Sequence, residues 1–200
     1  MKKTIITIMI VIVSMATFAQ KEPGTLTIYP RVGMTLSKFS GSKIAEGFEN
    51  GTKWYHSSFK PGFTAGAEFQ YQLDQVFAIS CGALYSQQGE QFKDIPDWGT
   101  IKTTHNDIIT PVCVLITPKQ GFLSFRVGLQ PEMKVKGNSY LYRPLTMSIP
   151  LGISYEYKDF CLDLRYNHGI INVNKDTSYG KENSNFNRTV MLTLGYGIEL

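Results

Sequence analysis

The sequence has few charged residues and little imbalance between the two signs. Charged residues make up 18% of the 200 residues, and 20 basic against 16 acidic side chains leave a net charge of +4. Nucleic acid is not an expected partner, because proteins that bind it carry a much stronger basic footprint. The chain has only three cysteines, and no pair of them has the close spacing of a zinc or redox motif. We therefore expect no metal and no cofactor.

Long hydrophobic runs are also missing, apart from one at the start of the chain. Two lysines precede an apolar run over residues 5–16, which is shorter than the roughly 20 residues of a membrane-spanning helix. The small residues that follow suit cleavage before Gln20, so residues 1–19 are expected to form a secretory signal peptide. Residues 20–200 would then form one exported domain.

Apolar residues recur at every second position along most of this domain. This alternation is typical of β-strands with one apolar face. The windows that show it are residues 26–36, 63–73, 77–85, 123–135, 145–157, 160–170 and 190–200. A further window, residues 106–116, is apolar on both faces and is also interpreted as a strand.

The connections between these windows alternate in length. Short turns at 74–75, 118–120 and 158–159 alternate with long connections at 38–61, 91–105, 137–144 and 172–187. Outer-membrane barrels have short turns on one side and long loops on the other. The sequence therefore predicts an all-β fold, an eight-stranded antiparallel up-and-down transmembrane β-barrel in the outer membrane, with both termini on the periplasmic side.

Alternation alone does not separate a membrane barrel from a soluble, lipocalin-like barrel. Lipid is favoured because the windows are long enough to cross hydrocarbon and because tyrosines on the apolar face lie towards the strand ends. The opposite face carries glycines and charges, which suit the crowded interior of a small barrel. Its charged members are candidates for structural ion pairs rather than a transport path: Arg31, Glu68, Arg126, Glu132, Asp163, Arg165 and Glu199.

The first long connection, residues 38–61, holds a dense group of aromatic residues. Phe48, Trp54, Tyr55 and Phe59 lie there among glycines and lysines. Exposed aromatic residues at this density favour the binding of a ligand, a protein or a glycan. The alternative is that the rings rest at the lipid headgroup boundary or over the barrel mouth.

Catalysis has few candidate residues. Lipid A deacylases with a barrel fold carry a His-x-Ser pair on a strand, and the candidates here are His56 with Ser58, and His168. The first pair lies in a long connection, and no nucleophile stands two positions after His168. We therefore expect no enzyme, and we expect all three histidines, His105 included, to be exposed loop or strand-rim residues.

Cys81 and Cys113 flank the second long connection on adjacent predicted strands. One interpretation is a disulfide between them, and the plainer one is two small apolar residues that face lipid. The third cysteine, Cys161, makes the number odd, so at least one thiol stays free or pairs elsewhere.

Four segments resemble a known family. They are PRVGMTLSKFSG at 30–41, LYSQQGEQF at 84–92, LDLRYNHGIINVN at 162–174 and NRTVMLTLGYGI at 187–198. In this order and spacing they resemble the PorT-like outer-membrane β-barrel proteins of the Bacteroidota. The resemblance implies a barrel without catalytic residues and, for one member type, an accessory role in protein secretion.

From the sequence we expect a non-enzymatic outer-membrane barrel that serves as a structural or accessory component of the envelope. Its expected surroundings are outer-membrane lipid, in which it is a monomeric barrel, and its candidate partners are secretion or envelope-assembly proteins. The alternative is a surface adhesin or ligand-binding barrel that uses the 38–61 connection. A lipid A-modifying enzyme is the third hypothesis.

Overall fold

The computed structural model describes residues 21–48, 51–95, 98–118, 122–136, 142–174 and 185–200. The expected signal peptide, residues 1–19, lies outside the described residues. The strands are β1 Leu26–Ser40, β2 Lys43–Phe48, β3 Gly51–His56, β4 Lys60–Gln72, β5 Phe77–Ile95, β6 Gly99–Ile109, β7 Val112–Ile116, β8 Leu123–Lys136, β9 Leu145–Tyr157, β10 Phe160–Asn172, β11 Phe186–Tyr196 and β12 Ile198–Glu199. No helix among these residues is long and apolar enough to cross a membrane.

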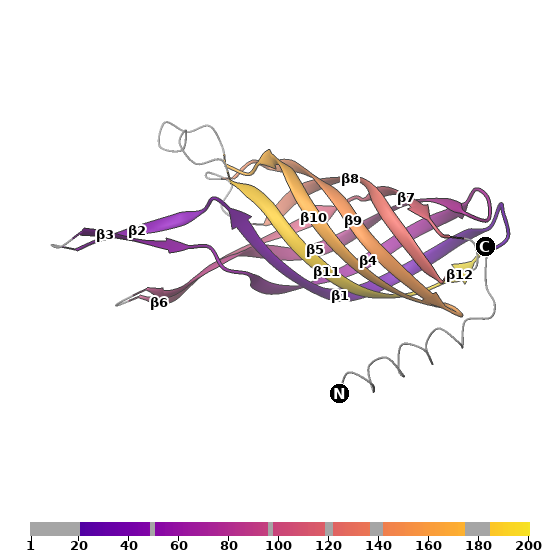
Figure 1. Ribbon diagram of the computed structural model, residues 1–200, viewed down its shortest axis with the longest axis horizontal. Helices are drawn as coiled ribbons and strands as arrows, with labels where there is room; N and C mark the ends of the chain where they lie inside the picture. The colour runs from indigo at the N-terminus through magenta and orange to yellow at the C-terminus, as the bar shows by residue number, and fades with distance from the viewer. Residues whose placement is uncertain (1–20, 49–50, 96–97, 119–121, 137–141, 175–184) are drawn as a thin grey trace.

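Ten of these strands form one antiparallel sheet that closes on itself, because β1 pairs with both β4 and β11. β7 continues β6 between β5 and β8, and β12 continues β11 beside β1. Ten strands less these two continuations give eight barrel strands. Figure 1 shows them running obliquely around the barrel. The predicted eight-stranded antiparallel up-and-down barrel is confirmed.

The apolar face of the wall points outwards. Val32 and Leu164 are 62% and 50% exposed, whereas the adjacent Arg31 and Arg165 are 3% and 1% exposed. Apolar side chains therefore cover the outside and polar side chains fill the inside. This is the arrangement of a membrane barrel and the reverse of a lipocalin-like one.

The short turns are built from local backbone chemistry. At the turn between β4 and β5, Oδ1 of Asp74 accepts hydrogen bonds from the backbone N–H groups of Val76 and Phe77, at 2.6 and 2.8 Å. These bonds hold the pKa of the Asp74 carboxyl below its usual range. Lys158, in the turn between β9 and β10, has a φ of 53°, which closes a tight reversal.

Glycine lets neighbouring barrel strands approach closely at two positions on the inner face. A Cβ atom added at Gly128 would lie 2.1 Å from the carbonyl oxygen of Val112, and one added at Gly82 would lie 2.4 Å from that of Ala67. Neither position has room for a side chain. The interior is crowded, as the glycine pattern predicts.

Two connections that the sequence predicted as long loops are largely β-structure. The first contains the β2–β3 hairpin, in which Ala45 pairs with Trp54. In the second, β5 and β6 stay paired beyond the end of the barrel, with Gln91 paired to Lys102. These segments lack a lipid-facing side, so they do not show the alternation that marks the barrel strands.

The two cysteines of the proposed disulfide face opposite sides of the wall. Cys81 pairs with Val112 and Cys113 pairs with Ser80, so their positions along adjacent strands differ by one residue. A one-residue offset turns a side chain to the other face; Cys81 is exposed and Cys113 is buried. The disulfide is therefore wrong, as is a lipid-facing position for Cys113. All three cysteines are free.

Candidate functional site

The barrel interior holds a connected cluster of arginines around one carboxylate. Glu68 of β4 lies 2.7 Å from Nη1 of Arg126, 2.8 Å from Nη2 of Arg165 and 3.1 Å from Nε of Arg31. All four side chains are buried. Because the three arginines come from β8, β10 and β1, the Glu68 carboxylate links four barrel strands through one group.

Asp163 of β10 shares two of these arginines. Its Oδ1 lies 3.0 Å from Nη2 of Arg165, and its Oδ2 lies 3.2 Å from Nε of Arg126. The hydroxyl of Ser154 donates a hydrogen bond to Oδ2 at 2.6 Å. Every carboxylate oxygen of the cluster thus faces a donor, as buried charges require.

Glu132 lies in a separate polar layer with neutral donors. Its Oε1 accepts hydrogen bonds from Ser148 at 2.7 Å and Gln130 at 2.9 Å, and its Oε2 accepts one from Asn187 at 3.0 Å. The predicted ion pair of Glu132 is therefore replaced by hydrogen bonds within the described part of the chain. Glu199, also predicted for the interior, is exposed on β12.

The end of the interior nearest the β5–β6 hairpin contains a histidine, His105, that was expected at the surface. His105 is 1% exposed, and its Nε2 lies 3.2 Å from Oδ2 of Asp107. Its ring stacks on Phe39, with 5.4 Å between centroids, and lies near Tyr142. The expected exposure is wrong for His105 because β6 begins at Gly99 and places this residue on its inward face.

The residues considered for catalysis do not form a His–Ser pair in the described part of the structure. His56 is exposed on β3, and the backbone of Ser58 pairs with Gln91 of β5. His168 is exposed on β10, beside the ring of Tyr166. Within the described ranges, no group of three or more His, Cys, Asp or Glu side chains is placed to hold a metal ion.

Two β-hairpins extend beyond the barrel at the end away from the C-terminus (Figure 1). We call residues 43–59 and 90–102 the hairpin platform. The N–H of Ser58 donates to the carbonyl of Gln91 at 2.7 Å, and the N–H of Gln91 donates back at 3.3 Å. A small apolar core joins the hairpins, formed by Tyr55, Phe92 and Ile95 with Ile101 packed against them. The two hairpins therefore form one packed unit.

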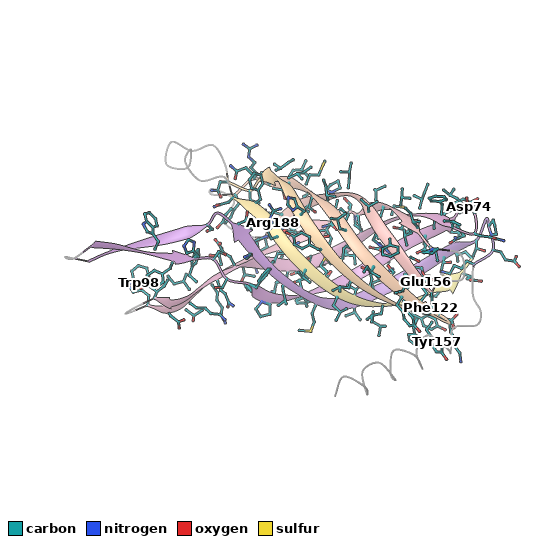
Figure 2. The ribbon with its side chains drawn as sticks, in the orientation of Figure 1. Asp74, Trp98, Phe122, Glu156, Tyr157 and Arg188 are labelled. Atoms are coloured by element: carbon teal, nitrogen blue, oxygen red, sulfur yellow. The ribbon has the colours of Figure 1, made fainter. Side chains whose placement is uncertain are left out.

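The aromatic residues predicted for binding divide into two groups. Tyr55 is 8% exposed and belongs to the platform core, whereas Trp54 and Phe59 are 50% and 41% exposed. Phe48 lies in β2, and its side chain is outside the described part of the structure. Trp98, at the tip of the second hairpin, is 73% exposed and was not predicted (Figure 2). Trp98 lies in the 91–105 connection, which the sequence predicted as a loop.

A carboxylate is buried where the platform meets the barrel. Burial raises the pKa of Glu90 above its usual range, and hydrogen bonds, one of them from the Ser42 hydroxyl at 3.1 Å, partly oppose this. Burial, together with the charge of Glu90, raises the pKa of Tyr142 to about 12. The base of the platform is thus a poorly solvated region in which a charge is costly.

A family model described as an outer membrane protein beta-barrel domain matches residues 18–175, which is more than half of the chain. The chain belongs to this family. As an outer membrane protein beta-barrel domain it has its place in the outer membrane, in agreement with the outward apolar face.

Several solved structures are similar to this outer membrane protein beta-barrel domain. Ail, the attachment invasion locus protein of Yersinia pestis, was solved with the heparin analogue sucrose octasulfate; it is 13% identical, with 88% of this chain and 99% of that chain covered and a TM-score of 0.47. OprG from Pseudomonas aeruginosa is 9% identical, with 90% and 99% covered and a TM-score of 0.46. A de novo designed transmembrane β-barrel is 13% identical, with 90% and 100% covered and a TM-score of 0.39. No curated protein matches the chain.

Proposed function

We propose that this protein is a non-enzymatic outer-membrane anchor that presents the hairpin platform outside the cell as a binding surface for a protein or a glycan. The observation that carries the proposal is the shared core of Tyr55, Phe92 and Ile95 between the two hairpins. Projecting hairpins held together by a buried core and a two-way backbone bridge have a fixed shape. A surface of fixed shape loses little conformational entropy when it binds a partner.

The exposed aromatic residues support a binding role for the platform. Trp54 and Trp98 stand on different hairpins of the same packed unit, and Phe59 lies where β4 begins. Tryptophan is enriched among the residues that dominate binding energy at interfaces. A protein or a glycan, each of which offers apolar surface beside polar groups, fits such a surface.

The interior supports an anchor rather than a channel. The arginines that line it are engaged by Glu68 and Asp163, and a small barrel is filled by its own side chains. A ring with β1 paired to β11 leaves no open sheet edge, which supports a monomer. The hypothesis of a lipid A-modifying enzyme finds no support in the placement of His56, Ser58 and His168.

The proposed orientation puts the platform outside the cell and both termini in the periplasm, after removal of residues 1–19. Outer-membrane barrels have their longer loops on the outside and their short turns on the periplasmic side, which supports this orientation. The PorT-like assignment and an accessory role in secretion stay predictions from the sequence. A secretion partner would be expected at the short turns.

Comparative affinity purification tests the binding role. Wild type, a W54A/W98A variant and a Y157A control would be reconstituted in nanodiscs and exposed to envelope extract and to medium components. Tyr157 is also an exposed aromatic, but it lies at the turn end (Figure 2). We expect a near-stoichiometric partner that the wild type and Y157A retain and W54A/W98A loses. A partner lost only from Y157A would contradict the proposal and favour the accessory role.

A further inference from the structure

Three basic residues form a row across the outside of the barrel at the platform end. Lys38 of β1 pairs with Arg188 of β11, and Arg188 pairs with His168 of β10. They therefore stand side by side on three neighbouring strands. Each faces the same side of the wall as an outward apolar residue two positions closer to the barrel centre. These residues are Leu36 for Lys38, Val190 for Arg188 and Tyr166 for His168. The row thus lies directly beyond the lipid-facing band.

An aromatic ring accompanies each member of the row. Nζ of Lys38 lies 4.8 Å from the ring centroid of Phe59, the Arg188 guanidinium carbon lies 5.9 Å from that of Phe186, and the His168 and Tyr166 centroids are 6.1 Å apart. Aromatic residues mark the level at which hydrocarbon gives way to headgroups. Long basic side chains at this level extend their charged ends towards the headgroups.

The row has no acidic ion-pair partner within the part of the chain that the structure describes. Among the described residues, no carboxylate forms an ion pair with Lys38, Arg188 or His168. The opposite end of the barrel differs, because its turns carry Asp74 and Asp159 (Figure 2 labels Arg188 and Asp74 at the two ends). The turn end also has a lysine, Lys158, but it stands next to Asp159. At the platform end, Arg188 donates a hydrogen bond to the backbone carbonyl of Gly169 at 3.2 Å, and no described carboxylate neutralises its charge or that of Lys38.

A groove in the outer wall begins next to this row. It has a volume of about 540 Å³ and is lined mainly by apolar side chains of β7 to β11, among them Phe125, Leu151, Ile153, Leu164, Tyr166 and Val190. Gly152, which has no side chain, lies within it. Two of its lining residues, Tyr166 and Val190, stand two positions from His168 and Arg188, so the groove ends one outward-facing position from the row on β10 and β11.

We infer that the basic row and the groove together bind one phosphorylated lipid of the outer leaflet. The phosphate group would lie against Lys38, Arg188 and His168, and an acyl chain would lie in the groove. Guanidinium and ammonium groups match phosphate oxygens in charge and geometry. Free phosphate has nothing to fill an apolar groove, so the structure favours a lipid. The choice of the outer leaflet rests on the orientation proposed above, whereas the site itself lies on the barrel wall and does not depend on what the platform binds.

Retention of lipid by the purified full-length barrel tests this directly. The protein would be reconstituted in phosphatidylcholine nanodiscs that contain a minor fraction of bis-phosphorylated lipid A, and bound lipid would be counted by native mass spectrometry after release. Each basic residue near a membrane surface contributes about fivefold in affinity for anionic lipid, so K38Q/R188Q should lower the preference for lipid A by roughly 25-fold. The matched control K158Q removes a single lysine that stands beside Asp159 at the turn end, so it should lower the preference by fivefold at most.

The groove has its own matched pair of variants. Leu164 lines the groove and Leu162, two positions away on the same outward face, does not. L164W should fill the groove and reduce lipid A retention severalfold, whereas L162W should not. The heat-dependent shift in electrophoretic mobility reports the folding of each variant. If K38Q/R188Q does not fold, two single variants are used instead. R188K keeps the positive charge at this position, and R188Q removes the charge.

Two further arms identify the ligand chemistry. Dephosphorylated lipid A should lose the preference, and excess inorganic phosphate should not displace lipid A from the wild type. Full displacement by inorganic phosphate would overturn the lipid assignment in favour of a free-anion site, and equal retention by the wild type and K38Q/R188Q would overturn the site altogether. Both sides of a nanodisc have the same composition, so these results do not depend on the orientation proposed above.

Discussion

The Glu68 carboxylate lies 2.7 Å from Nη1 of Arg126, although 58 positions separate the two residues in the chain. Both side chains are almost completely buried. The substitution E68Q would leave three guanidinium groups around the single carboxylate of Asp163. Removing one member of a buried charge pair costs about 3–5 kcal/mol, so we expect a loss of this size in the free energy of unfolding.

Urea unfolding of the reconstituted protein in phosphatidylcholine vesicles measures this loss. E199Q is the control, since Glu199 is exposed, and it should change the unfolding free energy by less than about 0.5 kcal/mol. Equal midpoints for the two variants would show that the interior cluster does not stabilise the barrel.

The platform core gives a second prediction. Phe92 is 3% exposed between the two hairpins, and F92A would remove most of the surface that joins them. Truncation of a buried phenylalanine costs about 3–5 kcal/mol. Because β5 and β6 contribute to this core only through their platform ends, hydrogen exchange should accelerate in residues 51–59 and 90–102 alone. W98A, which truncates an exposed ring, should leave exchange in residues 51–59 unchanged, and protection in F92A equal to the wild type would mean that the hairpins are independent.

Close approach of the barrel strands gives a third prediction. G128A would place a methyl group 2.1 Å from the carbonyl oxygen of Val112, and backbone has little room to move there. We expect G128A to reduce sharply the fraction of protein that shows the folded mobility on unheated gels. G195A is the comparison, because its nearest contact is a side-chain carbon of Arg31 at 3.1 Å, which has to move by only a few tenths of an ångström, and it should fold nearly as well as the wild type. Equal folded fractions in G128A and the wild type would contradict the crowding.

Glu90 predicts how platform stability depends on pH. Its folded pKa is raised from the ordinary 4.5, so the carboxyl stays protonated in the folded platform at pH values where it has ionised in the opened one. The contribution of Glu90 to platform stability is therefore fully present below about pH 4.5, and it is lost as pH rises through the folded pKa. The side chain at position 90 carries no charge in E90Q, so platform stability in this variant should not change with pH across this window. At neutral pH, exchange in residues 90–102 should be slower in E90Q than in the wild type, by roughly a few-fold.

The comparison is made at each pH between the two proteins, which removes the intrinsic pH dependence of exchange. If the stability of the wild-type platform varied with pH as little as that of E90Q, Glu90 would not be buried in solution.

The barrel could be predicted because lipid on one side and a filled interior on the other impose a strict alternation. Val32 and Arg31 show it directly, one exposed and the other buried. The inward position of the charged side chains followed from the same alternation. Ion pairs do connect five of them: Arg31, Glu68, Arg126, Asp163 and Arg165. Their individual pairs were not predictable, because they depend on which strands face each other across the interior.

The platform was missed for the opposite reason. Outside the membrane both faces of a hairpin can be polar, so residues 43–56 and 90–102 carry no alternation, and their pairing depends on contacts far apart in the sequence. His105 was misplaced because it belongs to this outward continuation of β6. Cys113 was misplaced because register, which decides the face, is not visible in one strand.

Labelling of intact cells with a membrane-impermeant maleimide would show whether the platform is displayed outside the cell. In a C81S background, which leaves only two buried thiols, single cysteines would replace Lys102 on the platform and Lys158 at the turn end. We expect K102C to be labelled on intact cells and K158C to be labelled only after the outer membrane is permeabilised. Labelling of K158C but not of K102C on intact cells would contradict this expectation.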